Sequence, residues 1–176
     1  GKEGFAMTKK FLFDAGISYY GDPNNRDGLS VMLEKKGIVI GVVGFHEFTY
    51  VHFEKVNAEV ERLRPLVDFL IVTPHWGPEY QKEPTENMRK WAHLWIDKGA
   101  DVVLGGHPHV IGDIEDYKDK KIFYSLGNFV FDQYFSTETS EGLAVQIALE
   151  KEDDRINALY TLTRVNIGRL GVTVSD

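Results

Sequence analysis

The chain of 176 residues contains no cysteine. A disulfide framework and metal sites built from thiolates are therefore both excluded. The chain also lacks long hydrophobic runs, because no stretch approaches the roughly 20 consecutive apolar residues of a membrane-spanning helix. No signal peptide is visible, and the opening GKEGFAMTKK does not resemble a native start. We therefore expect the sequence to begin partway through a protein.

The chain has fewer positively charged residues than negatively charged ones. Lys and Arg number 20 against 27 Asp and Glu, which gives a formal net charge of −7. This balance argues against binding a phosphate backbone through bulk charge, so no nucleic-acid partner is expected. An acidic substrate would have to be attracted locally, by metal ions or a few basic groups. The content of 43% hydrophobic and 27% charged residues is ordinary for a folded domain.

The pattern of apolar residues predicts a single layered α/β domain over 1–176, without repeats or linkers. Strand–helix–strand units fill the first two-thirds, and antiparallel strands fill the last third. Helices are expected at 3–15, 54–64 and 85–98. Strands are expected at 17–21, 29–33, 38–45, 67–73, 100–104, 110–117, 122–131, 143–149 and 156–167.

Three of the six histidines directly follow buried apolar strands. His75 follows FLIVTP, whereas His107 and His109 follow VVLGG. The predicted helix at 85–98 lies between the two strands and would make them parallel neighbours. In open α/β sheets, ligand sites collect outside the carboxyl ends of the strands. We therefore expect these two loops to lie side by side.

The residues around the histidines favour metal binding. Gly105-Gly106 and Pro108 break the regular strand geometry, so both neighbouring imidazoles can turn toward one pocket. Glycine also lets the backbone pass close to an ion or a phosphate. Imidazole is a common ligand of zinc, iron and nickel, and adjacent histidines can serve different ions of a two-metal site.

Two further polar residues are candidates for the site. Glu79 lies four residues after His75 and is either a carboxylate that orients an imidazole or an exposed loop acid. Asn128 is a polar residue within an apolar run, and a buried amide must find partners. It either braces the histidine loops or contacts the substrate.

The other three histidines allow more ordinary interpretations. His46, with Glu47 beside it, follows the strand at 38–45 and could lie at the rim of the site. His52 lies in an aromatic-rich loop, where packing or a mobile lid is expected. His93 lies off the main apolar face of the helix at 85–98, so solvation or a local partner satisfies it.

Three motifs together resemble a known family. HWGPEY, then GADVVLGGHPHV, then KIFYSLGNFVFD are similar to segments of the CapA family of capsule and poly-γ-glutamate synthesis proteins (PgsA-like). The resemblance runs along nearly the whole chain, including TKKFLFDAGISYYG near its start. This family is similar in fold to the calcineurin-like metallophosphoesterases. The resemblance therefore implies a layered α/β/β/α sandwich.

The resemblance also implies a centre with two divalent metal ions. His75 matches the isolated histidine of the superfamily, and His107 and His109 match its closing GHxH motif. By that mapping, His75 and His107 serve one ion and His109 the other. Imidazoles alone do not separate manganese, zinc and iron. Family members carry an earlier Asp-bearing motif and an Asn-His motif, so we expect this chain to be the C-terminal two-thirds of the domain, incomplete at its N-terminus.

The function implied is a metal-dependent phosphoesterase-like hydrolase linked to capsule or poly-γ-glutamate synthesis. Glu79 and Asn128 are its candidate catalytic residues, and His75, His107 and His109 its metal ligands. The alternative is a non-catalytic scaffold or export factor for an anionic cell-surface polymer. The resemblance further implies an anionic polymer or phosphoester as substrate, a membrane-associated synthase complex as partner, and an extracytoplasmic or cell-surface location. It leaves the oligomeric state open.

Overall fold

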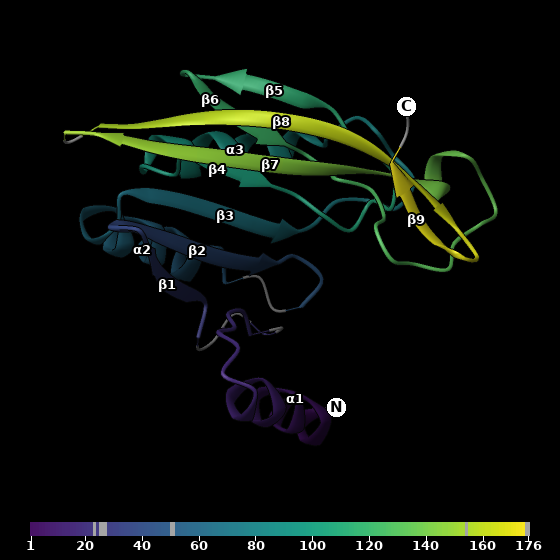
Figure 1. Cartoon of the computed structure of the whole chain (residues 1–176), viewed down its shortest axis with the longest axis horizontal. Coiled ribbons are helices and arrows are strands. Elements are labelled where there is room, and N and C mark those ends of the chain that lie inside the picture. The colour runs from purple at the N-terminus through teal and green to yellow at the C-terminus, as the bar shows by residue number, and fades with distance from the viewer. Residues whose placement is uncertain (23, 25–27, 50–51, 154, 175–176) are drawn as a thin grey trace.

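The computed structural model describes residues 1–22, 24, 28–49, 52–153 and 155–174, which form two packed β-sheets and three α-helices (Figure 1). The helices are α1 (Lys2–Asp14), α2 (Phe53–Leu63) and α3 (Glu86–Asp97), with 3-10 turns at Arg64–Leu66 and Glu138–Ser140. The strands are β1 (Ser30–Lys35), β2 (Ile38–His46), β3 (Phe69–His75), β4 (Val102–Leu104), β5 (Ile114–Tyr117), β6 (Lys120–Phe123), β7 (Glu141–Glu152), β8 (Arg155–Gly168) and β9 (Gly171–Val174).

The larger sheet is mixed, with the strand order β1-β2-β3-β4-β6-β5. Strands β2, β3, β4 and β6 run parallel, and the edge strands β1 and β5 pair with their neighbours in antiparallel fashion. The run IVIGVVGF in β2 is nearly all apolar because a parallel strand is covered on both faces. The carboxyl ends of the parallel strands all lie at the same end of the sheet. The histidine loops follow β3 and β4 at that end.

The two faces of this sheet pack against different layers. Helices α2 and α3 cover one face, and their buried side chains include Val60 and Trp95. Thr85 begins α3, because its side chain accepts a hydrogen bond from the backbone nitrogen of Met88 at 3.2 Å. Strands β7 and β8 pack on the opposite face, where Leu143 joins a cluster with Phe123. The described residues therefore form helix, sheet and sheet layers.

The mixed α/β class expected from the sequence is confirmed, as is the helix expected at 3–15. That helix, α1, has no buried residue and lies apart from both sheets (Figure 1). It therefore does not supply the fourth layer of the expected sandwich. None of the described helices is both long and apolar enough to cross a membrane.

Several predicted strand boundaries are wrong. The segment 17–21 forms no strand, and its Tyr20 hydroxyl instead accepts a hydrogen bond from Thr73 Oγ1 at 3.0 Å. The strand predicted at 122–131 ends at Phe123, and beyond it Leu126 and Gly127 form isolated bridges. Apolar alternation marks burial, and it does not by itself supply the neighbouring strand that pairing requires. Strand β9 had not been predicted.

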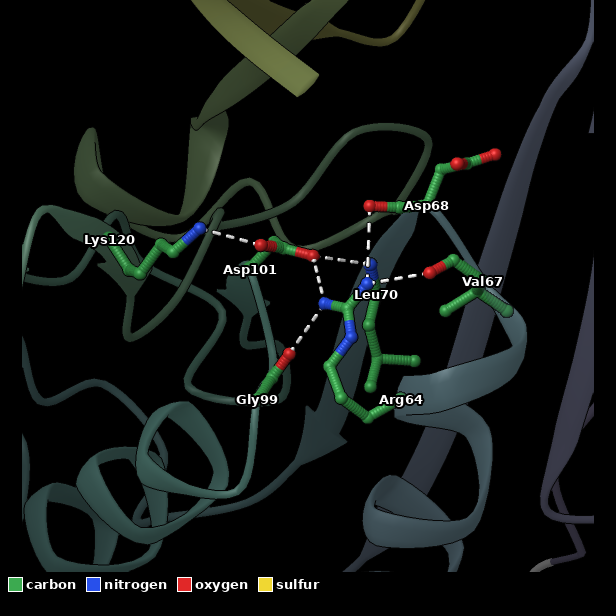
Figure 2. A network of polar contacts seen from close by, with 7 residues as sticks. All are labelled: Arg64, Val67, Asp68, Leu70, Gly99, Asp101 and Lys120. Carbon is green, nitrogen blue, oxygen red and sulfur yellow. Dashed lines mark hydrogen bonds and ion pairs between the residues drawn. The ribbon is translucent and has the colours of Figure 1, made fainter. Parts of the chain in front are cut away.

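At the amino ends of the parallel strands, opposite the histidines, a polar network centres on Asp101 (Figure 2). The Asp101 carboxylate accepts hydrogen bonds from Arg64 at 2.7 Å, from the backbone nitrogen of Leu70 at 2.8 Å and from Lys120 at 2.6 Å. Arg64 also donates to the carbonyl oxygens of Gly99, Val67 and Asp68. One carboxylate thus connects the start of β3 with β6 and with the turn after α2.

Replacing Asp101 with alanine should destabilise the fold. The Asp101 side chain is only 11% exposed, so its loss leaves the Leu70 nitrogen without its side-chain acceptor and the Arg64 charge without its carboxylate. We expect urea denaturation to show a loss of about 3 kcal/mol in the free energy of unfolding. The control is Asp116→Ala, because Asp116 pairs with Lys121 but is 73% exposed. Equal stabilities of the two variants would contradict a structural role for this network.

Candidate metal centre

The two histidine loops are joined by the backbone. Beyond the regular part of the β3–β4 pair, the Gly106 nitrogen donates to the Pro74 oxygen at 2.9 Å, and the Trp76 nitrogen donates to the Gly106 oxygen at 3.1 Å. These bonds continue the parallel pairing past the ends of both strands. The rings of His75 and His107 consequently lie with their centroids 4.6 Å apart.

Gly105 is required by a close approach of the chain. The indole nitrogen of Trp76 donates to the Tyr124 oxygen at 2.9 Å, directly beside this glycine. A Cβ atom at Gly105 would lie 2.3 Å from the Tyr124 oxygen and 2.6 Å from the indole nitrogen. A larger residue would force the loop outward and displace the histidines that follow it.

The GHPH segment adopts an unusual backbone conformation. His107 has a φ of +103° and His109 a φ of +61°, a region that residues other than glycine seldom occupy. The Tyr80 nitrogen donates to the Pro108 oxygen at 2.7 Å and so holds the segment against the loop that follows β3. Such strain persists only where the surroundings enforce it, and it clusters at functional sites.

These loops bring a carboxylate and two imidazoles together. The ligand atoms of Glu79, His107 and His109 all lie within 4.8 Å of one another, and this is the only such group of three or more donors in the part of the chain that the structure describes. Two imidazoles and a carboxylate are a donor set that suits zinc, iron and similar divalent metals. The residues present therefore fit a metal ion. His75 lies beside this group, next to His107.

The electrostatics of the loops favour neutral imidazoles. Partial burial, followed by the charges of His107, His46 and His109, lowers the pKa of His75 from 6.5 to about 4. Burial and the charge of His109 also lower the pKa of His107. A metal ion binds the neutral form of imidazole, so these shifts remove proton competition at neutral pH.

Asn128 orients one of the histidines. Its Oδ1 lies 2.8 Å from His109 Nδ1, and its Nδ2 donates to the Thr139 oxygen at 2.9 Å. Since a carbonyl oxygen only accepts, the second bond fixes the orientation of the amide and leaves Oδ1 facing the imidazole. His109 Nδ1 therefore carries the proton, and Nε2 keeps a lone pair for a metal. This is the bracing geometry that the sequence offered as one of two alternatives.

The last residue of β2 and the loop after it also contact the cluster, and the sequence predicted only the position of His46 at its rim. The ring of His46 stacks on His75 with centroids 4.8 Å apart, which places His46 at the edge of the cluster. Glu47 Oε2 accepts a hydrogen bond from the Gly77 nitrogen at 2.6 Å and so holds the HWGPEY loop. Phe48 lies over the cluster, with its ring centroid 4.3 Å from that of His107.

The aromatic contacts were missed because exposed phenylalanines give no motif. Besides Phe48, Phe131 stacks on His109 with centroids 5.0 Å apart. The remaining histidines are not part of the cluster: His93 contacts Glu115 Oε1 at 2.7 Å, and His52 lies at the start of α2. His93 thus has the local partner that the sequence suggested.

Comparison with known proteins identifies relatives in sequence. Residues 1–133 match the family described as bacterial capsule synthesis protein PGA_cap. The capsule biosynthesis protein CapA of Bacillus anthracis is 41% identical over 187 aligned positions, which cover 95% of this chain and 44% of that protein. The PGA biosynthesis protein CapA of Bacillus subtilis is 39% identical over 129 positions, which cover 65% of this chain and 34% of that protein. The chain thus spans less than half the length of these relatives.

Solved structures support the fold. A hypothetical protein from Thermus thermophilus aligns with a TM-score of 0.53 and 16% identity over 81% of this chain and 67% of that one. A phosphatase from Mycoplasma pneumoniae aligns with a TM-score of 0.51 and 11% identity over 76% of this chain and 57% of that one. At such low identities, the likeness concerns the fold alone.

Replacing Asn128 with alanine should weaken metal binding without removing a ligand. The substitution deletes the acceptor that orients His109, and the loss of such partners typically lowers metal affinity about 10- to 100-fold. Isothermal titration with Zn²⁺ or Mn²⁺ would measure the change. Asn157→Ala is the control, because Asn157 donates to Glu152 on the exposed end of the β7–β8 hairpin. An unchanged affinity in Asn128→Ala would contradict the orienting role.

Proposed function

The chain belongs to the PGA_cap family of bacterial capsule synthesis proteins, and we propose that its histidine cluster is part of a metal-dependent phosphoesterase-type site. The observation that carries this proposal is the convergence of Glu79, His107 and His109 at the carboxyl ends of adjacent parallel strands. Because the chain spans less than half of its relatives, the activity proposed is that of the whole protein.

Each residue of the cluster has a separate task in this proposal. Glu79, His107 and His109 hold a divalent ion, which supplies Lewis-acid stabilisation of charge on a phosphoryl oxygen. Asn128 keeps the His109 proton on Nδ1. Phe48 and Phe131 contact the rings of His107 and His109 and form the apolar border of the cluster.

We propose two divalent ions for the complete site, of manganese, zinc or iron. His75 supports a second position, because its ring lies 4.6 Å from that of His107 and outside the group formed with Glu79. Both histidines have lowered pKa values and are available as neutral ligands. Glu79, His107 and His109 would then serve the first position. This distribution differs from the one that the family resemblance implies, in which His75 and His107 share one ion and His109 binds the other.

The biological setting proposed is synthesis of a cell-surface polymer outside the cytoplasm, alongside a membrane-associated synthase complex. Support comes from the names of the relatives, which concern capsule or PGA biosynthesis. A phosphoester or an anionic polymer is the substrate class consistent with them. With a net charge of −7, the chain would attract such a substrate locally, through the metal ions or a few basic groups.

The test uses His107→Ala in the protein as the cell makes it. Removing this ligand should lower the affinity for Mn²⁺ or Zn²⁺ by at least about tenfold and should reduce hydrolysis of bis-p-nitrophenyl phosphate in parallel. His93→Gln is the matched control, because His93 contacts Glu115 away from the cluster. Absence of a bound transition metal in the wild type, with unchanged hydrolysis in His107→Ala, would overturn the proposal.

One observation favours a second candidate, a non-catalytic scaffold or export factor for an anionic polymer. Among the described residues, Glu79, His107 and His109 form the only group of three or more metal donors, and a second ion would have His75 alone beside it. The same His107→Ala strain separates the two functions. Loss of polymer secretion from cells whose phosphodiester hydrolysis is unaltered would support the scaffold, whereas parallel loss of both supports the enzyme.

A further inference from the structure

A cavity of about 660 Å³ lies beside the metal cluster. Its size is within the usual range of small-molecule sites. One wall begins at Tyr80, the residue after Glu79, and another is Val110, the residue after His109. The third wall comes from the segment 135–139. Two of the three walls are thus direct continuations of the segments that carry the metal donors.

The cavity is fixed relative to the cluster by hydrogen bonds. Asn128 contacts His109 on one side and donates to the Thr139 oxygen, in the third wall, on the other. The Tyr80 nitrogen donates to the Pro108 oxygen. A group bound in the cavity would therefore lie at a constant distance from a phosphoryl group at the metal site.

Two aromatic side chains, together with Val110, form the apolar part of the cavity. Tyr80 is 45% exposed and Phe135 is 66% exposed, so both present ring surface to solvent. Their centroids are 5.4 Å apart with an interplanar angle of 82°. In this edge-to-face pair the two rings are not parallel, so a planar nucleobase cannot stack between them. A ligand can pack against the face of one ring only. Such faces suit the apolar face of a puckered ring.

The charged groups of the cavity argue against a polyanion. Lys82 is accompanied by two carboxylates, Glu83 and Glu138. The pKa of Glu138 is lowered by a backbone hydrogen bond, by the Ser136 side chain and by the charge of Lys82, so this carboxyl is ionised at neutral pH. A carboxylate ligand could pair with Lys82 only and would face two like charges.

Hydroxyl groups of a ligand match these side chains better than a carboxylate does. A hydroxyl both donates and accepts, whereas a carboxylate only accepts and an ammonium only donates. Glu138, Lys82 and Gln81 offer an acceptor, a donor and a group with both functions. An uncharged ring that carries several hydroxyls can therefore use all of them at once.

We propose that this cavity binds a sugar residue of the substrate, adjacent to the phosphoryl group held at the metal cluster. The phosphoryl part of this assignment rests on the proposed function. The sugar site itself consists of protein side chains alone and can be tested without metal. Binding of a sugar in this cavity would favour a glycosyl phosphoester over a poly-glutamyl chain as the substrate.

The test is saturation-transfer difference NMR on the chain in the presence of EDTA. The probes are methyl glycosides of glucose, galactose and N-acetylglucosamine, with γ-glutamylglutamate and adenosine as comparisons. At least one glycoside should receive saturation, and Phe135→Ala should weaken its binding about fivefold. Phe13→Ala is the control, because Phe13 is a 76% exposed phenylalanine on α1, outside the cavity.

The outcomes separate this site from the metal proposal. Glycoside binding that Phe135→Ala weakens and Phe13→Ala preserves supports the sugar site, even if hydrolysis is later found to be absent. Binding of γ-glutamylglutamate or adenosine as strong as that of the glycosides would overturn the sugar assignment. A lack of response to every probe would also overturn it, while leaving metal binding by His107 to be judged by its own titration.

Discussion

The candidate site depends on the continuation of one strand pairing past the ends of its strands. Two backbone hydrogen bonds of Gly106, to Pro74 and from Trp76, keep β3 and β4 together where their loops begin. Because these strands are parallel and buried between helices and a second sheet, neither loop can move away without breaking the core. Gly105 allows the approach, since any side chain there would collide with Tyr124 and Trp76. The histidines of the two loops are therefore placed by the fold before any metal binds.

The two ends of the sheet have opposite electrostatic characters. At the amino ends, Asp101 satisfies its charge with Arg64 and Lys120 and holds the strands in position. At the carboxyl ends, burial and then the neighbouring imidazoles lower the pKa of His75 to about 4, so its neutral form is favoured. A cluster of this kind is costly to protonate and ready to bind a cation. The cavity beside it is lined by two carboxylates and one ammonium, Glu83, Glu138 and Lys82. Under the proposed function, the anionic group of a substrate would be held at the metal and its uncharged part in this cavity.

Much of the fold could be predicted because its signals are local. The apolar run of β2 lies within a few consecutive residues. The same is true of the one-sided apolar pattern of α3, which has Thr85 at its start. The loop positions of His75 and His107 followed from strand order alone. The role of Glu79 could not be decided, because its distance from His109 is set by the Tyr80–Pro108 contact between separate loops. The strand predicted through Asn128 ends at Phe123 for a similar reason, because Asn128 and Phe131 contact His109 from a separate loop.

The most direct measurement of the central claim is anomalous diffraction from crystals grown with Mn²⁺ or Zn²⁺. The account predicts a peak at coordination distance, roughly 2.0–2.3 Å, from Glu79, His107 and the Nε2 atom of His109. It also predicts that His109 Nδ1 stays bonded to Asn128 when the ion is present. A metal peak that avoids these three residues, or a crystal soaked in metal that shows none, would contradict the claim that the loops after β3 and β4 form a metal centre.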